Sequence, residues 1–208
     1  MSPWAVSGVI ALAYAGLLAW YEGFRAPLTA DEVAAVVARQ TQRGTPPEQV
    51  ERLRRFLEAD DGGDFVMVNA IELRDAPLAV EGVREGESSQ QALDRYMAYM
   101  WPELLLRACH PVVAGPAAAG ALDVWGIAGG ERWSMAGLMR YRSRRDLVEI
   151  AMNDAFRDAH VFKTAAMQKT IAFPIAPYVS VGDPRLVAGL ALFSLGALAH
   201  LWIRPSRR

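Results

Sequence analysis

The sequence predicts an α+β domain built on a four-stranded antiparallel sheet, with one apolar helix at each end of the chain. Three observations predict this. Residues 133–151 read as a strand that runs directly into a helix. Strand-like and helix-like segments alternate between residues 64 and 176. The runs 4–21 and 186–203 contain no Asp, Glu, Lys or Arg, and roughly 18 apolar residues are about the minimum that spans a bilayer.

Composition excludes several classes of function. The net charge of -1 does not provide the basic face that nucleic-acid binding requires. The single Cys109 excludes an internal disulfide framework and a cysteine-rich metal site. The mean hydropathy of +0.10 is high for a purely soluble domain, because apolar residues are concentrated at the two ends.

The first apolar run, 4–21, is bracketed by Trp4, Trp20 and Tyr21 as interfacial anchors. A cleaved signal peptide is the alternative, but the run lacks a basic segment before it and a small-residue cleavage site after it. We therefore expect a retained transmembrane helix.

The second run, 186–203, lies between Arg185 and Arg204 and is more uniformly apolar than a core helix. We expect a second transmembrane helix here. The small residues on both spans are expected to allow close helix packing: Gly8, Ala11, Ala15, Gly189, Gly196 and Ala197.

Residues 29–60 are expected to form a helical hairpin. Thr29 with Glu32, and Thr45 with Glu48, have the spacing of capping boxes and predict the starts of two helices. We expect this hairpin to be a stalk that joins the membrane to the domain at 64–176.

Within the domain, 65–73 reads as a central strand, because its first residues are apolar on both faces. Ser88 and Gln91 then predict the start of a long helix that Pro102 should kink or split. Residues 112–118 and 121–128 offer two short strands.

Glycines 129 and 130 predict a hairpin into the strand 133–141. Ser143 has the position of a helix N-cap, with Asp146 placed to bond back to the free N–H of the cap. A further helix is expected at 156–168 and a closing edge strand at 170–175.

This β-α-β-β-α-β order is that of the ferredoxin-like fold, an antiparallel sheet with helices on one face. Its other face must be covered by a partner, a ligand or additional elements.

Several motifs carry a family resemblance. Residues 67–73 (MVNAIEL), the pair Tyr96 and Tyr99, and residues 140–151 followed by His160 resemble the dimeric α/β-barrel superfamily. They are most similar to its branch of small bacterial proteins of unknown function, which has an Arg-Tyr-Pro-Ser-Arg junction. Here Arg142 replaces the proline. The resemblance covers 64–176 and implies the fold; the superfamily includes cofactor-free monooxygenases, haem-handling enzymes and stress-response proteins.

Six residues are candidates to line a ligand pocket with an apolar wall and a few polar groups. The alternative is an ordinary core or a dimer-covered face. These candidates are Asn69, Trp133, Met135, Met139, Tyr141 and His160.

The arginines at the strand–helix junction are candidates for binding an anion, although pairing with nearby acids on a solvated edge is the simpler interpretation. They are Arg140, Arg142, Arg144 and Arg145. The sequence shows no catalytic triad, phosphate loop or metal-ligand spacing, so no catalytic or metal-binding residue is assigned.

His200 is an ionisable residue inside a predicted span, which makes it a candidate for function. The segment 196–205 resembles helices of bacterial light-harvesting polypeptides, in which such a histidine ligates a chlorophyll. This resemblance implies a tetrapyrrole, pigment or haem, at His200. The alternative is a histidine that reaches the headgroup region.

We expect a membrane-anchored accessory or scaffold subunit without catalytic activity, docked beside an integral membrane complex. The alternatives are a membrane-tethered enzyme or binder of an apolar small molecule, monooxygenase-like or tetrapyrrole-handling, and a homodimer without further partners. The expected location is the bacterial inner membrane, with both termini on one side and the domain extracytoplasmic. The basic tail Arg204, Arg207 and Arg208 favours cytoplasmic termini, whereas Arg25 after the first span argues the other way.

Overall fold

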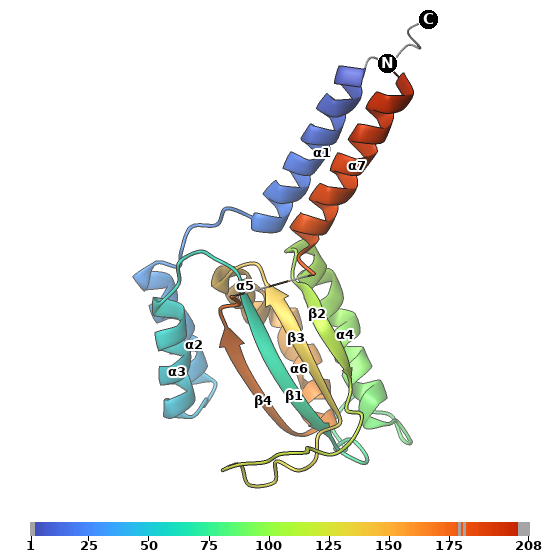
Figure 1. Ribbon diagram of the computed structural model, residues 1–208. Helices are drawn as coiled ribbons and strands as arrows, with labels where there is room; N and C mark the ends of the chain where they lie inside the picture. Colours follow the sequence, from blue (N-terminus) through green and yellow to red (C-terminus); the bar gives the residue numbers. More distant parts are fainter. Residues whose placement is uncertain (1–2, 179, 181, 204–208) are drawn as a thin grey trace, which may run out of the picture. The chain divides into compact units, whose positions relative to one another are not determined.

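The computed structural model describes residues 3–178, 180 and 182–203. The chain divides into two compact units. The first contains the two terminal helices, and the second contains residues 25–176 (Figure 1). We describe each unit separately.

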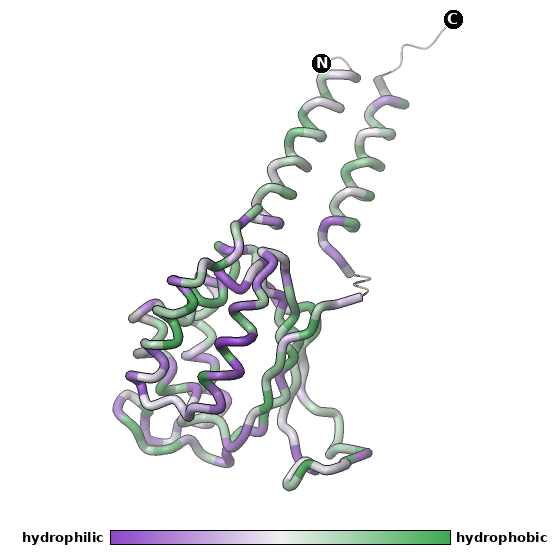
Figure 2. The backbone as a smooth tube through the Cα atoms, turned by 90° about the vertical axis from the view of Figure 1, so that its left-hand side faces the viewer, coloured by the Kyte–Doolittle hydropathy of each residue, from purple (hydrophilic) through white to green (hydrophobic). Residues whose placement is uncertain are grey.

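The terminal unit is a pair of helices, α1 (Pro3–Glu22) and α7 (Pro184–Ile203). Both are long and apolar enough to cross a membrane, and hydrophobic residues recur along both of them (Figure 2). Only 6% of the apolar window of α1 and 0% of that of α7 is buried. They are therefore not core helices, whose apolar residues would be covered by protein.

Three contacts show that α1 and α7 run antiparallel. The Ser7 Oγ lies 2.8 Å from His200 Nε2, and the Tyr14 hydroxyl donates to the Arg185 carbonyl at 3.1 Å. At the other end, Arg185 Nη1 donates to Glu22 Oε1 at 2.6 Å. The first and last described residues therefore lie at the same end of the pair (Figure 1).

The second unit is built on a four-stranded sheet of β1 (Phe65–Leu73), β2 (His110–Pro116), β3 (Met135–Tyr141) and β4 (Met167–Ile175). Its strand order is β2-β3-β1-β4, and each neighbouring pair is antiparallel. The structure is thus α+β, as the sequence predicts.

Our prediction of a strand at 121–128 was wrong, because this segment forms an irregular loop. The physical reason is that β3 already pairs with β2 on one side and with β1 on the other. No edge of β3 is left for an additional strand, so the connection from β2 to β3 is a long loop rather than a glycine hairpin.

Helices α4 (Ser89–Leu106), α5 (Arg144–Met152) and α6 (Asp154–Ala166) lie on one face of the sheet (Figure 1). The expected capping box of Ser88 and Gln91 opens α4, which continues as one helix through Pro102. Leu93, Tyr96, Met100 and Leu104 of α4 are buried in the main core. Their spacing of three and four residues places them on one side of the helix.

Helices α2 (Ala30–Gln42) and α3 (Pro47–Glu58) form the predicted hairpin. The capping box of Thr29 and Glu32 is present. The second predicted capping box is absent: Pro46 is the N-cap, and the Thr45 hydroxyl donates to Gln40 Oε1 instead. Because Pro47 occupies the first helical position, which suits its fixed φ, Thr45 falls one residue too early to cap.

The hairpin also packs onto α5. Val33, Val36 and Leu57 form a buried cluster that Val148 and Met152 contact. The segment that we expected to be a stalk therefore belongs to the same compact unit as the sheet.

Candidate functional site

A cavity of about 390 Å³ lies between the sheet and α4. Alternating residues of β1 and β3 point toward it, as the register Met67–Met139 and Ile71–Met135 requires. Its wall is mainly apolar and rich in methionine, a flexible side chain that fills irregular space. The apolar wall includes Ile71, Leu93, Met97, Met100, Leu104, Met135, Met139 and Met167.

Four of the six predicted pocket residues line this cavity: Asn69, Met135, Met139 and Tyr141. The other two do not. Trp133 precedes the first residue of β3, Met135, so its side chain does not follow the alternation of the strand. Its indole N–H donates to the Gly130 carbonyl at 2.8 Å.

His160 is held behind the cavity wall. Its ring centroid lies 6.3 Å from that of Tyr96 and 5.5 Å from that of Phe156. Burial lowers its pKa, and the nearby charges of Lys163 and Arg43 lower it further. His160 is therefore a neutral packing residue near neutral pH rather than a cation in the pocket.

The cavity contains a few polar groups. The Asn69 side-chain N–H donates to the Met67 carbonyl at 3.0 Å and the Gly137 carbonyl at 3.4 Å. Burial raises the pKa of the Tyr96 and Tyr141 phenols, so both stay protonated. For neither hydroxyl is a hydrogen bond found in the described part of the chain. These two groups are free to bond a ligand.

Sequence reasoning did not assign Gln90, Asp94, Thr170 or Lys163 to the cavity, and Lys163 on α6 is the one basic residue among its lining residues. The chain contains only two lysines, and this one follows Val161 and Phe162 in a largely apolar segment. That context was the available signal, but it does not by itself show that a cavity lies beside the amine.

The junction arginines are paired with acids or carbonyl oxygens. Arg140 donates to Asp64 at 2.8 Å and to the Ala108 carbonyl at 3.0 Å. Arg142 forms two bonds of 2.8 Å to Asp146. Only 4% and 7% of these two arginines is exposed. The pairing agrees with the simpler interpretation, but these ion pairs are buried rather than on a solvated edge.

The other two arginines fasten the hairpin. Arg145 bonds Glu32 at 2.5 Å, and Arg144 donates to the Ala59 carbonyl at 2.5 Å while its guanidinium lies 4.9 Å from the Phe56 ring centre. These contacts leave little capacity at the junction for binding an anion.

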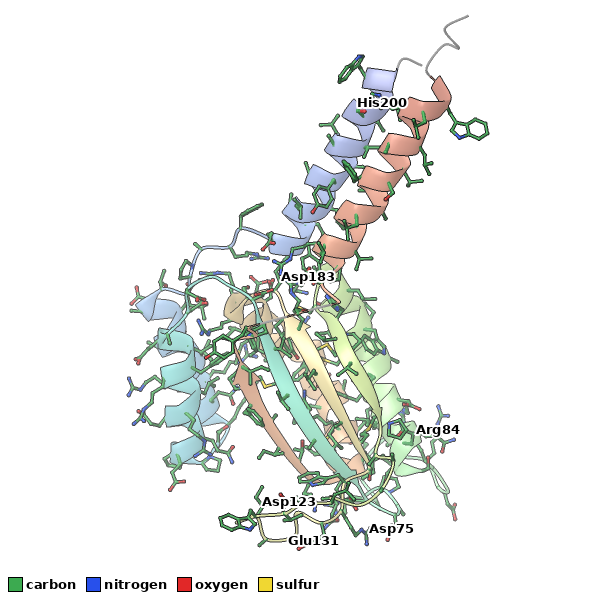
Figure 3. The ribbon with its side chains drawn as sticks, viewed as in Figure 1. Asp75, Arg84, Asp123, Glu131, Asp183 and His200 are labelled. Atoms are coloured by element: carbon green, nitrogen blue, oxygen red, sulfur yellow. The ribbon has the colours of Figure 1, made fainter. Side chains whose placement is uncertain are left out.

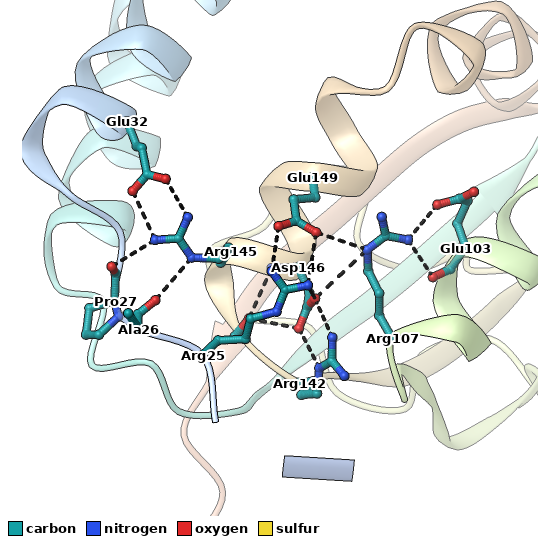
Figure 4. Close-up of polar contacts among 11 residues, drawn as sticks. Arg25, Ala26, Pro27, Glu32, Glu103, Arg107, Arg142, Arg145, Asp146 and Glu149 are labelled. Atoms are coloured by element: carbon teal, nitrogen blue, oxygen red, sulfur yellow. Dashed lines mark hydrogen bonds and ion pairs between the residues drawn. The ribbon is translucent and has the colours of Figure 1, made fainter. Parts of the chain in front are cut away.

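Asp146 is the centre of this network (Figure 4). The carboxylate is fully buried, accepts from the Ser143 hydroxyl at 2.9 Å, and also lies 3.6 Å from Arg25 and 3.9 Å from Arg107. The carboxylate therefore accepts hydrogen bonds from Arg142 and from the Ser143 hydroxyl, whereas we expected it to accept one from the Ser143 backbone N–H. Burial raises its pKa, but the hydrogen bonds from Arg142 and Ser143 outweigh that effect and hold the pKa below its usual range.

His200 lies near the end of α7 (Figure 3). Its Nε2 is engaged by the Ser7 hydroxyl at 2.8 Å, and the Trp4 ring contacts it edge-on at 5.5 Å. A tetrapyrrole metal at Nε2 would have to displace Ser7.

The small residues of the spans divide into two groups. A Cβ added at Gly189 would lie 3.0 Å from the Tyr14 hydroxyl, and one at Gly196 would lie 3.6 Å from Ile10. These two glycines therefore pack against the chain's own α1. The remaining four small residues are exposed on the helix pair: Gly8, Ala11, Ala15 and Ala197.

Cys109 is buried, and burial raises the pKa of its thiol to about 11, so it is not a reactive thiolate. Among the residues that the structure describes, no three His, Cys, Asp or Glu side chains are placed to hold a metal ion.

No family model matches the chain, and no curated protein matches it. Among solved structures, it is similar to RPA0582, a protein of unknown function from Rhodopseudomonas palustris. One crystal structure of that protein has a TM-score of 0.52 and 20% sequence identity, and covers 64% of this chain and 95% of the other. A structure of the methylated protein has a TM-score of 0.53 and 21% identity, and covers 66% and 96% of the two chains. This likeness shows the α+β fold alone.

Proposed function

We propose that this protein binds an apolar small molecule in the cavity beneath its sheet while its terminal helices anchor it in a membrane. The cavity carries this proposal. Its volume of about 390 Å³ falls in the range of small-molecule sites, and its apolar wall contains a few polar groups, as such sites do. The unbonded hydroxyls of Tyr96 and Tyr141 provide those polar groups.

Anchoring is supported by the exposure of the terminal helices. Leu12, Phe193 and Trp202 are at least 75% exposed, which is unfavourable in water and favourable in lipid. The antiparallel pairing of α1 and α7 supports termini on one membrane side. The basic tail that favours a cytoplasmic location for them lies outside the described residues.

We assign the sheet unit to the ferredoxin-like fold and to the dimeric α/β-barrel superfamily. The assignment is supported by the element order β1-α4-β2-β3-α5-α6-β4 together with the strand order β2-β3-β1-β4.

A second candidate function, assembly, is favoured by the open face of the sheet. Val113, Ile171 and Phe173 are 59%, 44% and 46% exposed there, and Val68 and Leu138 lie between them in the register. Exposed apolar strands usually meet a partner. We propose a second copy as that partner, following the superfamily assignment. Phe173→Glu should convert the dimer to a monomer in detergent without weakening the far-UV circular dichroism signal of the protein.

The binding proposal is tested by photolabelling the full chain in lipid nanodiscs with a diazirine-bearing dodecanol. We expect labelled peptides from the cavity wall. Ala114→Phe, which fills the cavity from β2, should reduce this labelling. Ala117→Phe is the matched control, because this exposed alanine directly follows β2 and does not line the cavity. Wild-type labelling confined to the terminal helices would refute the proposal.

A further inference from the structure

The pocket proposal leaves the amine of Lys163 without a role. Lys163 lies in the last turn of α6 and lines the cavity. Its Nζ lies 5.7 Å from the centre of the Tyr96 ring. Within the described part of the chain, no hydrogen bond or ion pair to this Nζ is found.

In this respect Lys163 differs from the buried arginines of the unit. The buried Arg140 and Arg142 each bond a carboxylate. The other lysine, Lys169, donates to the Gly129 carbonyl and lies 4.5 Å from the ring centre of Trp133, away from the cavity.

The one acid among the lining residues does not pair with the amine. Asp94 of α4 also lines the cavity, but its carboxylate accepts a hydrogen bond of 2.8 Å from Gln90 and lies beyond ion-pair distance of Lys163. The polar groups of the cavity are thus one basic group that has no ion-pair partner, the acid Asp94, the amides of Asn69 and Gln90, two phenols and the Thr170 hydroxyl; the rest of the wall is apolar.

Burial lowers the pKa of the Lys163 ammonium, because the cation loses hydration that no protein group replaces. An anion brought into the cavity would replace it with a charge-assisted hydrogen bond, which is about twice as strong as a neutral one. A neutral apolar ligand would leave the Lys163 ammonium without hydration and without a hydrogen-bond partner.

We propose that the ligand of this cavity is an acid with an apolar body, whose carboxylate pairs with Lys163 while its apolar part lies along the methionines of α4 and β3. This inference rests on the proposed binding function and names the chemical class of its ligand.

The register of the sheet gives the ligand a direction. Met167, which directly follows α6, pairs with Leu73 at the end of β1, whereas Tyr141 pairs with Phe65 at its start. Lys163 lies about one helical turn before Met167, so its backbone is near the Leu73 end of β1, whereas the backbone of Tyr141 is near the Phe65 end. The carboxylate lies at the Lys163 end, and the apolar body extends toward Tyr141.

The test compares two photoreactive probes of equal chain length, a diazirine-bearing dodecanoate and the corresponding dodecanol. The full chain is held in phosphatidylcholine nanodiscs at a pH where the acid is ionised. Labelled peptides are identified by mass spectrometry. The cavity labelling by each probe is divided by its labelling of α1 and α7, which reports the concentration of that probe in the bilayer.

We expect the corrected cavity labelling by dodecanoate to exceed that by dodecanol by about tenfold or more, since one charge-assisted bond distinguishes them. Lys163→Met keeps the length of the side chain and removes its charge, so it should reduce the acid's labelling to the level of the alcohol. Lys169→Met is the matched control and should leave both unchanged. A melting temperature at or above that of the wild type checks that Lys163→Met folds.

Equal cavity labelling of the wild type by the two probes would overturn this inference and leave the binding proposal standing. Cavity labelling by neither probe would overturn the binding proposal, and the inference with it. The comparison of the two probes on the wild type does not depend on any variant, so it tests the inference even if Lys163→Met fails to fold.

Discussion

Asp146→Asn tests whether the buried network at the start of α5 stabilises the fold. The substitution keeps the shape of the side chain but removes the charge that holds Arg142. Asp146 is fully buried and only 7% of Arg142 is exposed, so the remaining guanidinium would be a buried cation without its counter-ion. Breaking such a pair costs about 3–5 kcal/mol.

We expect the lower end of this range, about 3 kcal/mol, because the asparagine oxygen still accepts one hydrogen bond and because Arg25 and Arg107 keep their ion pairs with Glu149. For a unit of this size, 1 kcal/mol corresponds to about 2–4 °C, so the melting temperature should fall by about 6–12 °C. Thermal unfolding followed by circular dichroism in one detergent measures this.

Two further variants sharpen the result. Glu51→Gln breaks only exposed ion pairs with Arg54 and Arg55 on α3 and should leave the melting temperature unchanged. The double variant Arg142→Met with Asp146→Leu should recover much of the loss, because it removes both buried charges. If Asp146→Asn melts at the same temperature as Glu51→Gln, the network does not stabilise the fold and our reasoning is wrong.

The pKa of Asp146 also fixes the sign of the pH dependence. Its folded pKa lies below the ordinary value of 3.8. The ionised carboxylate therefore stabilises the folded state fully above about pH 3.8, and this contribution is lost as the pH falls through the folded pKa. Asp146→Asn should lack this part of the acid dependence.

Three other outcomes are expected. The hydrogen bonds from Arg145 and from the Thr29 backbone lower the pKa of Glu32 to about 2, so their stabilisation of the fold should disappear as the pH falls from 4.5 to 2. Arg145→Met should therefore make the melting temperature depend less on pH over this window. Gly189→Leu should clash with Tyr14 and reduce disulfide cross-linking between cysteines introduced at Ser7 and His200, whereas Gly8→Leu, which points into open space, should not. The protein should stay with membranes through a carbonate wash, and its release into the soluble fraction would contradict the anchoring proposal.

The sequence by itself determined the features that depend on near neighbours in the chain. The caps at Thr29 and Ser88 were predictable because each bonds a residue three positions away. The period-two alternation in β1 and β3 placed Asn69, Met139 and Tyr141 on one face of the sheet, since successive side chains of a strand point to opposite faces. The apolar character of α1 and α7 follows from composition alone.

Only the tertiary structure decided the features that depend on distant parts of the chain. Residues 121–128 have the composition of a strand, but a strand needs a free edge, and β1 and β2 occupy both edges of β3. The alternation in β1 and β3 offered candidate pocket residues but left a filled core open as the alternative, because it tells which residues face the helices and not whether α4 fills the space between them. The sequence also could not show the surroundings of Lys163. Whether an amine is solvated, paired or alone in an apolar cavity depends on which residues the fold brings within a few ångströms of it.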